Sequence, residues 1–420
     1  MEIENKQEVG TLNRQIINHF PGYEFVVDEK GKHNMYRGVD LGLGGYVYSE
    51  PGIYKNVALL DCASEHPSSI ILLNKLGEYT QRYADLRNAR VLIKHKDYDA
   101  VGKLFDGKLK KYLSSDEEAE MLSMALKYPI NAFYGISTAS FSNPARDKMD
   151  KNNIIALRGA LFMKTLQDAV VEKGFQVVHI KTDSIKIPNA TPEIIKFVEE
   201  FGEMYGYQME HEATYAKMCL VNKAVYIAKY DDRGIRNKGG KHAGEWTATG
   251  TQFQVPYVFK TLFSHEKIEF SDMCETKSVT GEDAIYLDFN EDLVHDYEVD
   301  LQNIKTRISE GGTGVMALRK EAKAIQEKID ATHNLQFIGK CGSFVPVKSG
   351  CGGGLLVRSK KTGGYAAVTG TIGYRWMESE VVRARGMEDQ VDKLYFRKLV
   401  DDAYSAIAEY GDAETFINVG

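Results

Sequence analysis

The segment from residue 175 to 187 constrains the fold of this 420-residue chain more than any other. Two runs rich in Val and Ile, at residues 175–180 and 185–187, flank the polar sequence Lys-Thr-Asp-Ser. Apolar β-branched runs separated by a tight polar turn predict a β-hairpin, and hence an antiparallel sheet that carries Asp183 at a hairpin tip. Taken alone, an Asp at such a tip is more often simple turn chemistry than part of a site.

A second carboxylate ends another apolar run. Residues 57–60 predict a short buried strand that stops at Asp61, and a helix start follows. Taken alone, Asp61 is more often a cap or turn residue. Together with Asp183, however, it supplies the one or two protein carboxylates that Mg²⁺ prefers to combine with substrate phosphates. Two such ions, about 3.5 to 4 Å apart, can activate a 3′-hydroxyl and stabilise a leaving pyrophosphate, so we expect two Mg²⁺ or Mn²⁺ ions here.

Helical patterns alternate with these strands. Helices are expected over residues 75–98, from Ser115 onwards, and over 153–173, 315–332 and 387–410, while residues 1–56 predict short strands and turns. Ser115 and Glu118 have the spacing of a capping box. Pro129 should kink the helix that they start, or weaken its next turn.

One face of that helix carries a polar triad. Lys127, Asn131 and Tyr134 recur at i, i+4 and i+7 and therefore share a face. A cation, an amide and a phenol aligned in this way could meet a triphosphate and a base pair. A solvated polar stripe is the alternative.

Charge is distributed unevenly along the chain. The net charge of −6 argues weakly against a nucleic-acid partner. Residues 331–377 nevertheless contain Lys and Arg and not one Asp or Glu. A surface that faces phosphates would explain this composition, and a solvated face would explain it equally well.

Several classes of protein are disfavoured. The five cysteines include no CxxC pair, which argues against structural zinc and indicates reduced thiols. No run approaches the roughly 18 apolar residues of a membrane helix. Since the N-terminus also lacks the pattern of a secretory signal, we expect a cytoplasmic protein without membrane contact.

Three motifs, in order, resemble those of family B DNA polymerases. Residues 61–68 are similar to the family's DxxSLYPS, residues 127–135 to KxxxNSxYG, and residues 182–184 to DTDS. The matching positions are Asp61, Ser64, Pro67, Ser68, Lys127, Asn131, Tyr134, Gly135, Thr182, Asp183 and Ser184. More weakly, Gly44-Gly45 resembles the YxGG element near the template, and Lys223 with Tyr226 resembles the KKRY element that touches the primer.

The resemblance implies an α+β right hand, with an antiparallel-sheet palm, helical fingers and a mixed thumb. It divides the chain into an N-terminal segment with the first part of the palm (1–75), fingers (76–140), palm (141–270) and thumb (271–420). The implied activity is template-directed addition of dNTPs to a primer 3′-hydroxyl. Primer–template DNA and dNTPs are then the partners.

The resemblance also implies roles for individual residues. Asp61 and Asp183 would ligate the metals, and the backbone around Ser64 would cradle triphosphate oxygens. The nucleotide would further meet His66, Arg90, Lys94, Lys127, Asn131 and Tyr134, where Arg90 and Lys94 have the one-turn spacing of the family's fingers cations. Contacts with DNA are expected from Gly44, Gly45, Lys181, Lys223, Tyr226, Lys340, Lys348 and Arg358.

Three departures from the family pattern keep alternatives open. Lys181 replaces the first DTDS aspartate, and a non-catalytic DNA-binding subunit that kept the fold is one alternative. His66 replaces the tyrosine that excludes ribose, and a ribonucleotide-tolerant primase-polymerase is another. Only 60 residues precede Asp61, so we expect no proofreading exonuclease in this chain and a separate one, if any. Compact polymerases of this kind resemble phage-encoded replication enzymes.

Overall fold

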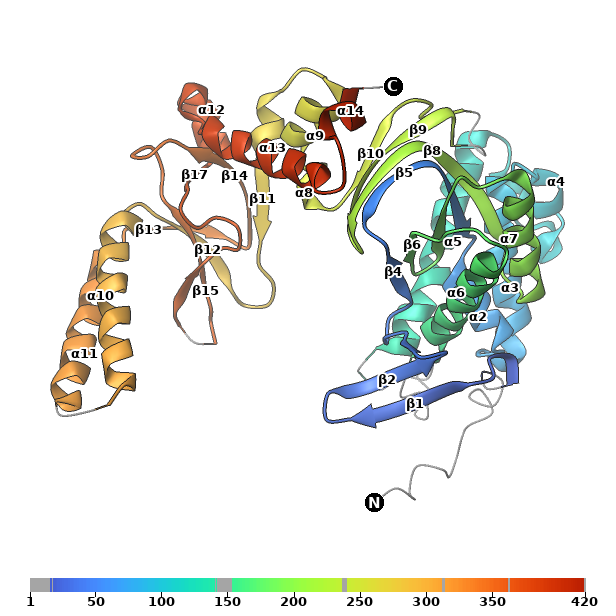
Figure 1. Ribbon diagram of the computed structural model, residues 1–420, viewed down its shortest axis with the longest axis horizontal. Helices are drawn as coiled ribbons and strands as arrows, with labels where there is room; N and C mark the ends of the chain where they lie inside the picture. Colours follow the sequence, from blue (N-terminus) through green and yellow to red (C-terminus); the bar gives the residue numbers. More distant parts are fainter. Residues whose placement is uncertain are drawn as a thin grey trace. The chain divides into compact units, whose positions relative to one another are not determined.

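The computed structural model describes residues 16, 18–139, 141, 153–235, 240–311, 314–361 and 363–418. The chain forms two compact units, unit 1 (residues 1–250 and 407–419) and unit 2 (essentially residues 251–406). Both combine antiparallel sheets with helices (Figure 1), so the expected α+β class is confirmed. The division into palm, fingers and thumb stays a prediction, and the compact units change over at residues 250/251, before the expected start of the thumb at 271.

Unit 1 is built around a seven-stranded sheet whose neighbouring strands are all antiparallel. Its order is β10-β9-β8-β5-β7-β6-β4, and Figure 1 shows β5, β8, β9 and β10 curving together. The strands are β4 (Val47–Ser49), β5 (Gly52–Cys62), β6 (His179–Lys181), β7 (Ser184–Pro188), β8 (Met209–Asn222), β9 (Val225–Ile235) and β10 (Trp246–Thr249). The expected hairpin is confirmed as β6–β7, although its first strand is shorter. The strand expected at 57–60 starts earlier, within β5.

A smaller sheet and seven helices complete the described part of unit 1. The sheet contains β1 (Tyr23–Asp28), β2 (Gly31–Tyr36) and β3 (Val39–Asp40) in that order. The helices are α2 (Glu65–Leu72), α3 (Thr80–Lys94), α4 (Tyr98–Val101), α5 (Asp116–Thr138), α6 (Ile154–Glu172), α7 (Pro192–Met204) and α14 (Ala413–Asn418). The helices expected over 75–98 and 153–173 correspond to α3 and α6.

The start of α5 follows the sequence in part. The Ser115 hydroxyl accepts from the N–H of Glu118 at 3.2 Å, so the expected cap is present. The second half of the capping box is wrong, because the Glu118 carboxylate accepts from the Ser114 hydroxyl instead. The helix also continues through Pro129 to Thr138.

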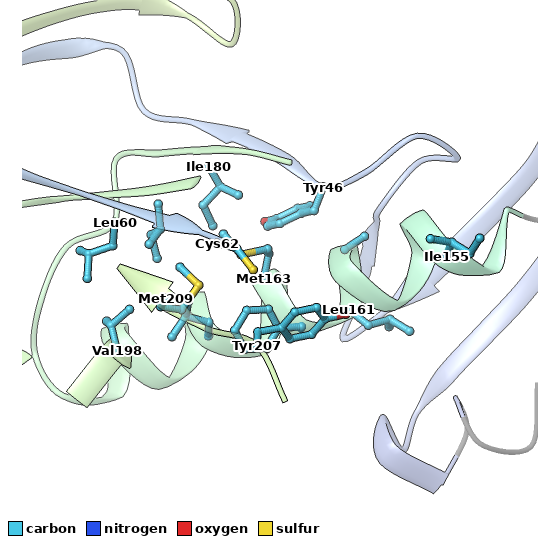
Figure 2. Packing of buried hydrophobic residues seen from close by; sticks show 14 of the residues in the cluster. Tyr46, Leu60, Cys62, Ile155, Leu161, Met163, Ile180, Val198, Tyr207 and Met209 are labelled. Carbon is cyan, nitrogen blue, oxygen red and sulfur yellow. The ribbon is translucent and has the colours of Figure 1, made fainter. Parts of the chain in front are cut away.

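The core of unit 1 lies between the sheet and its helices. Helix α6 is buried almost all round from Ile154 to Gln167, which explains why its apolar residues do not keep to one face. Leu60 and Cys62 of β5 pack into this core beside Met163 and Met209 (Figure 2). Since side chains alternate along a strand, Asp61 points to the opposite face of the sheet.

That opposite face carries a second, smaller apolar cluster on β5, β8 and β9. Its buried members are Val57, Tyr215, Met218, Leu220 and Ala228. Helix α14 also packs within unit 1, where the ring of Phe416 lies 5.7 Å from that of Trp246. Residues on both sides of unit 2 in the sequence therefore belong to one compact body.

Unit 2 contains two sheets, with orders β11-β14-β17 and β13-β12-β15-β16. The strands are β11 (Glu275–Ser278), β12 (Ala284–Asp288), β13 (Leu335–Gly339), β14 (Cys341–Val347), β15 (Gly354–Arg358), β16 (Tyr365–Ala367) and β17 (Arg375–Glu378). The longer helices are α10 (Glu291–Ser309), α11 (Val315–Thr332), α12 (Ser379–Ala384) and α13 (Lys393–Ala408). The helix expected over 315–332 is α11, the last expected helix starts only at Lys393, and α10 was missed.

Among the ranges given above, no helix is both long and apolar enough to cross a membrane.

Candidate active site

The two expected carboxylates lie close together in unit 1, Asp61 near the end of β5 and Asp183 in the turn between β6 and β7. Asp61 stands opposite Ser184 in the β5–β7 ladder. The N–H of Cys62 donates to the carbonyl of Asp183 at 2.8 Å. Asp183 itself follows Thr182, whose φ of 56° forms the tight turn of the hairpin. The structure therefore brings together the two residues that the sequence placed 122 positions apart.

Negative charge is concentrated at this point. Burial, together with the charges of Asp183 and Glu212, raises the pKa of Asp61 to about 7. Burial also raises the pKa of Asp183, an effect that the charge of His66 opposes. Carboxylates that are buried side by side favour a bound cation, since each resists ionising next to the other. Sequence reasoning missed Glu212. This residue occupies a half-buried position between two buried residues of β8.

A buried lysine lies close behind the carboxylates. Burial lowers the pKa of Lys186 to about 8, and the charge of Asp61 opposes that change. The ammonium group of Lys186 lies 3.1 Å from Nδ1 of His179 and 5.0 Å from the ring centroid of Tyr226. His179 in turn contacts the carbonyl of Lys223 through Nε2 at 3.1 Å. The sequence signal for Lys186 was a single charge inside the apolar run 185–187, and it was overlooked.

These contacts place the weaker primer motif near the carboxylates. Lys223 lies in the turn between β8 and β9, and Tyr226 lies on β9. Both are joined to Lys186 through His179, whose ring centroid is 5.9 Å from that of Tyr226. Lys181 ends β6, is exposed, and pairs with Ser184 across the hairpin.

The expected template element borders the same hairpin. The N–H of Thr182 donates to the carbonyl of Tyr46 at 3.0 Å. Gly45 has a φ of 122°, and a Cβ atom there would lie 3.1 Å from Cγ2 of Thr182. Gly44 and Gly45 are thus placed beside Asp183, and Gly45 is required by both backbone conformation and space.

The helix that follows Asp61 begins with a special backbone conformation. Ser64 is left-handed, with φ 60° and ψ 58°, and no side chain caps α2. Its carbonyl accepts from both the N–H and the hydroxyl of Ser68, each at 2.9 Å. The N-terminus of a helix offers N–H groups and a positive dipole end to an anion. The expected phosphate cradle is therefore available next to Asp61.

Helix α3 turns cationic side chains towards this region. Arg87 donates from Nη2 to the carbonyl of Ala63 at 3.0 Å. The charge of Lys94 acts on Asp61, and the charge of Arg90 acts on Lys94. Burial lowers the pKa of each of these three cations. Within the described ranges, the Nε atoms of Arg87 and Arg90 are buried without an acceptor, which suits a ligand that brings oxygens.

Helix α5 contributes unevenly. The Tyr134 ring is 4.2 Å from that of His66 at 68°, and its hydroxyl accepts from Nδ2 of Asn153 at 3.0 Å. Lys127 and Asn131 are exposed further towards the N-terminus of the helix. The contacts given for the described residues do not join these two to the carboxylates, so their roles stay predictions.

The three expected DNA contacts of unit 2 are exposed. Lys340 donates to the carbonyl of Gly281, and Lys348 donates to that of Asp389 at 2.9 Å. The guanidinium of Arg358 lies 5.6 Å from the ring centroid of Tyr365. A contact with DNA stays a prediction for all three.

Residues 331–377 contain no Asp or Glu, but carboxylates from other segments lie beside them in the fold. Lys360 pairs with Glu282 at 2.8 Å, and Arg375 pairs with Glu291 at 2.7 Å. Carboxylates from β11–β12 and α10 thus lie beside a segment that has none of its own. Part of the unusual composition of residues 331–377 therefore reflects pairing inside unit 2.

The donor groups near Asp61 and Asp183 determine which metal ion could bind there. In the described part of the chain, no three His, Cys, Asp or Glu side chains are grouped to hold a metal ion. Magnesium needs fewer protein ligands, because it keeps waters and takes substrate phosphates. Asp61 and Asp183, which are half-buried and repel each other, are a donor set of that kind.

Comparison with known proteins leaves the family unassigned. No protein-family model matches the chain, and no curated protein matches it. Among solved structures, the family B DNA polymerase from the hyperthermophilic archaeon Pyrobaculum calidifontis is similar at 14% sequence identity with a TM-score of 0.42. The similarity covers 86% of this chain and 46% of that one. The chain thus spans less than half of that polymerase, and its activity has to be argued from its own residues.

Proposed function

We propose that this chain is a template-directed DNA polymerase that adds dNTPs to a primer 3′-hydroxyl by phosphoryl transfer. The observation that carries the proposal is the meeting of Asp61 and Asp183 at adjacent strand ends. The cationic face of α3 and the open N-terminus of α2 support it, because they supply positive charge where a triphosphate would lie.

The two carboxylates would hold two Mg²⁺ or Mn²⁺ ions. Such ions, when bound, supply activation of a hydroxyl and neutralisation of phosphate charge. The protein's own contribution is rigidity, since Asp61 lies on β5 and Asp183 lies in the turn that leads into β7 of the same sheet. Leu60 of β5 and Ile185 of β7 are fully buried. Carboxylates fixed in this way would hold the ions, and through them the primer terminus and the nucleotide, in one place without reorganisation.

Positive groups would bind the triphosphate from two sides. The backbone after Ser64 would donate to its oxygens from α2. Arg90 and Lys94 would contact it from α3, and Arg87 joins them because its Nε is buried and unpaired among the described residues. Lys127 and Asn131 belong to the same proposal, and bringing them in would require closure of α5 over the nucleotide.

The DNA would approach along the edge of the β6–β7 hairpin. Gly44 and Gly45 would meet the template strand, where a side chain would collide with Thr182. Lys181, Lys223 and Tyr226 would contact the primer. Lys340, Lys348 and Arg358 would contact the duplex from unit 2.

Primer extension tests the proposal directly. A labelled primer–template is incubated with Mg²⁺ and dNTPs, and with rNTPs in parallel. Asp61→Ala and Asp183→Ala should abolish extension while DNA binding, measured by anisotropy, is retained. Asp106→Asn is a matched control, because its side chain is 94% exposed and its left-handed backbone accepts Asn.

The results separate the alternatives. If either alanine variant extends the primer as well as the wild type does, Asp61 and Asp183 do not have the proposed role. DNA binding without extension under Mg²⁺ or Mn²⁺ would identify a non-catalytic subunit. Equal use of rNTPs and dNTPs would identify a ribonucleotide-tolerant enzyme.

A further inference from the structure

The two residues that follow Ser64 form a close pair, of which Glu65 is buried and His66 is half-buried. Glu65 and His66 stand where the DxxSLYPS pattern has Leu and Tyr. The Glu65 side chain is only 1% exposed, and its Oε2 lies 2.8 Å from Nδ1 of His66. Burying a carboxylate is costly unless a partner compensates it. His66 is such a partner, and the charge of Arg158 also acts on the Glu65 carboxylate.

The space for this pair comes from helix α6. A Cβ atom on Gly159 would lie 1.2 Å from Oε1 of Glu65. Any other residue at position 159 would therefore displace the carboxylate. Glycine weakens the interior of a helix, and here its absence of a side chain makes room for Glu65.

The His66 ring is held at its other side as well. It meets the ring of Tyr134 edge to face at 4.2 Å, and Asn153 donates to the Tyr134 hydroxyl. Nδ1 of His66 is engaged by Glu65, which leaves Nε2 for a ligand. In the part of the chain described here, Oδ1 of Asn153 is buried without a donor, a second polar atom that can serve a ligand.

The place of the ring indicates what it meets. His66 belongs to the first turn of α2, where the triphosphate is proposed to lie. It also touches Tyr134, which is proposed to check the base pair. The sugar of a nucleotide joins its phosphates to its base, so the sugar would pass beside the His66 ring.

We infer that Glu65 is a positioning residue, which fixes the His66 ring against the sugar of the incoming nucleotide in the space that Gly159 leaves. This inference rests on the proposed function for the identity of the ligand. Glu65 does not touch the nucleotide. It acts by limiting His66 to one orientation, and that orientation sets how much room a 2′-hydroxyl has.

Kinetics of single-nucleotide incorporation test the inference. Glu65→Gln keeps the size of the side chain and removes its charge, and Glu65→Leu removes the polar group that lies beside Nδ1 of His66. Both should raise the KM for dNTP about tenfold, with a smaller change in kcat, and both should lower the preference for dNTP over rNTP. Glu200→Gln, an exposed Glu on α7, is the control and should change neither.

A double-mutant cycle tests the role of Gly159 without any activity measurement. Gly159→Ala should strongly lower stability in the wild-type background, because the new methyl meets Glu65. The same change should cost much less in a Glu65→Ala background, where the collision is gone. Equal losses in the two backgrounds would refute the pairing of Gly159 with Glu65.

Nuclear magnetic resonance of the His66 ring separates this inference from the proposed function. The ring signals of His66, which depend on the Glu65 carboxylate 2.8 Å from Nδ1, should shift in Glu65→Leu. If the wild type does not extend primers, the proposed function fails, and this shift still decides whether Glu65 positions His66. If the wild type is active, unchanged KM and sugar preference in both Glu65 variants overturn the inference.

Discussion

The buried carboxylate of Asp61 should make the metal-free protein less stable than it could be. Its pKa rises from 3.8 to about 7 on folding. Below pH 3.8 the group is neutral in both the folded and unfolded states and costs nothing. Above pH 7 it is ionised in both, and the folded state bears the full cost, about 4 kcal/mol. The contribution of Asp61 to wild-type stability should therefore fall as the pH rises from 4 to 7.

Asp61→Asn removes this ionisation but keeps the shape of the side chain. In EDTA at pH 8 the variant should be more stable than the wild type. The gain is reduced by the cost of burying the amide, which does not depend on pH. The difference between variant and wild type should be about 2 to 3 kcal/mol smaller at pH 5 than at pH 8. Scanning calorimetry at the two pH values measures it, and hydrogen exchange of β5 assigns the transition to unit 1.

Magnesium should reverse the order of stability of the wild type and Asp61→Asn. Added Mg²⁺ stabilises whichever form binds it, so it should raise the stability of the wild type more than that of Asp61→Asn. Asp106→Asn should follow the wild type under every condition. A stability difference between Asp61→Asn and wild type that is the same at pH 5 and pH 8 would refute the reasoning.

Three further predictions concern the surroundings of the carboxylates. Arg90→Gln should raise the KM for dNTP about tenfold, because it removes a charged hydrogen bond to phosphate. DNA affinity, measured by anisotropy, should stay the same. Unchanged kinetics would show that Arg90 does not belong to the site. Gly45→Ala should lower the free energy of unfolding by about 1 to 2 kcal/mol, because φ is positive and the new Cβ would crowd Thr182. Denaturant unfolding measures this change. An unchanged free energy of unfolding would contradict the close contact with Thr182. Leu60→Ala should cost about 2 to 5 kcal/mol, since Leu60 is fully buried beside Asp61, and a loss below 1 kcal/mol in the same assay would show that the strand is not held by this packing.

Local patterns predicted the elements that depend on neighbours in sequence. The β6–β7 hairpin, the cap at Ser115 and the extent of α11 follow from alternation, hydrogen-bonding side chains and periodicity, all of which act within a few residues. The approach of Asp61 to Asp183 needed more, since only strand pairing sets it, and the motif order supplied that information.

Partners that come from distant segments were not predictable in this way. Nothing near Lys186 in the sequence indicates that His179 and Tyr226 surround it in the fold. The sequence near Glu65 does not indicate that its side chain is buried against Gly159 of the distant helix α6. Helix α10 was missed because its polar residues outnumber its apolar ones, and its few buried residues pack against α11 rather than into a large core.

The return of α14 to unit 1 has a consequence for biosynthesis. A ribosome delivers Phe416 only after the strands of the seven-stranded sheet and the whole of unit 2. Trp246 and Lys217, which contact the Phe416 ring, lack this contact until residue 416 has been translated. Nascent chains stalled before residue 413 should then expose this surface to chaperones, and a late frameshift should impair the body that carries the carboxylates more than the one encoded next to it.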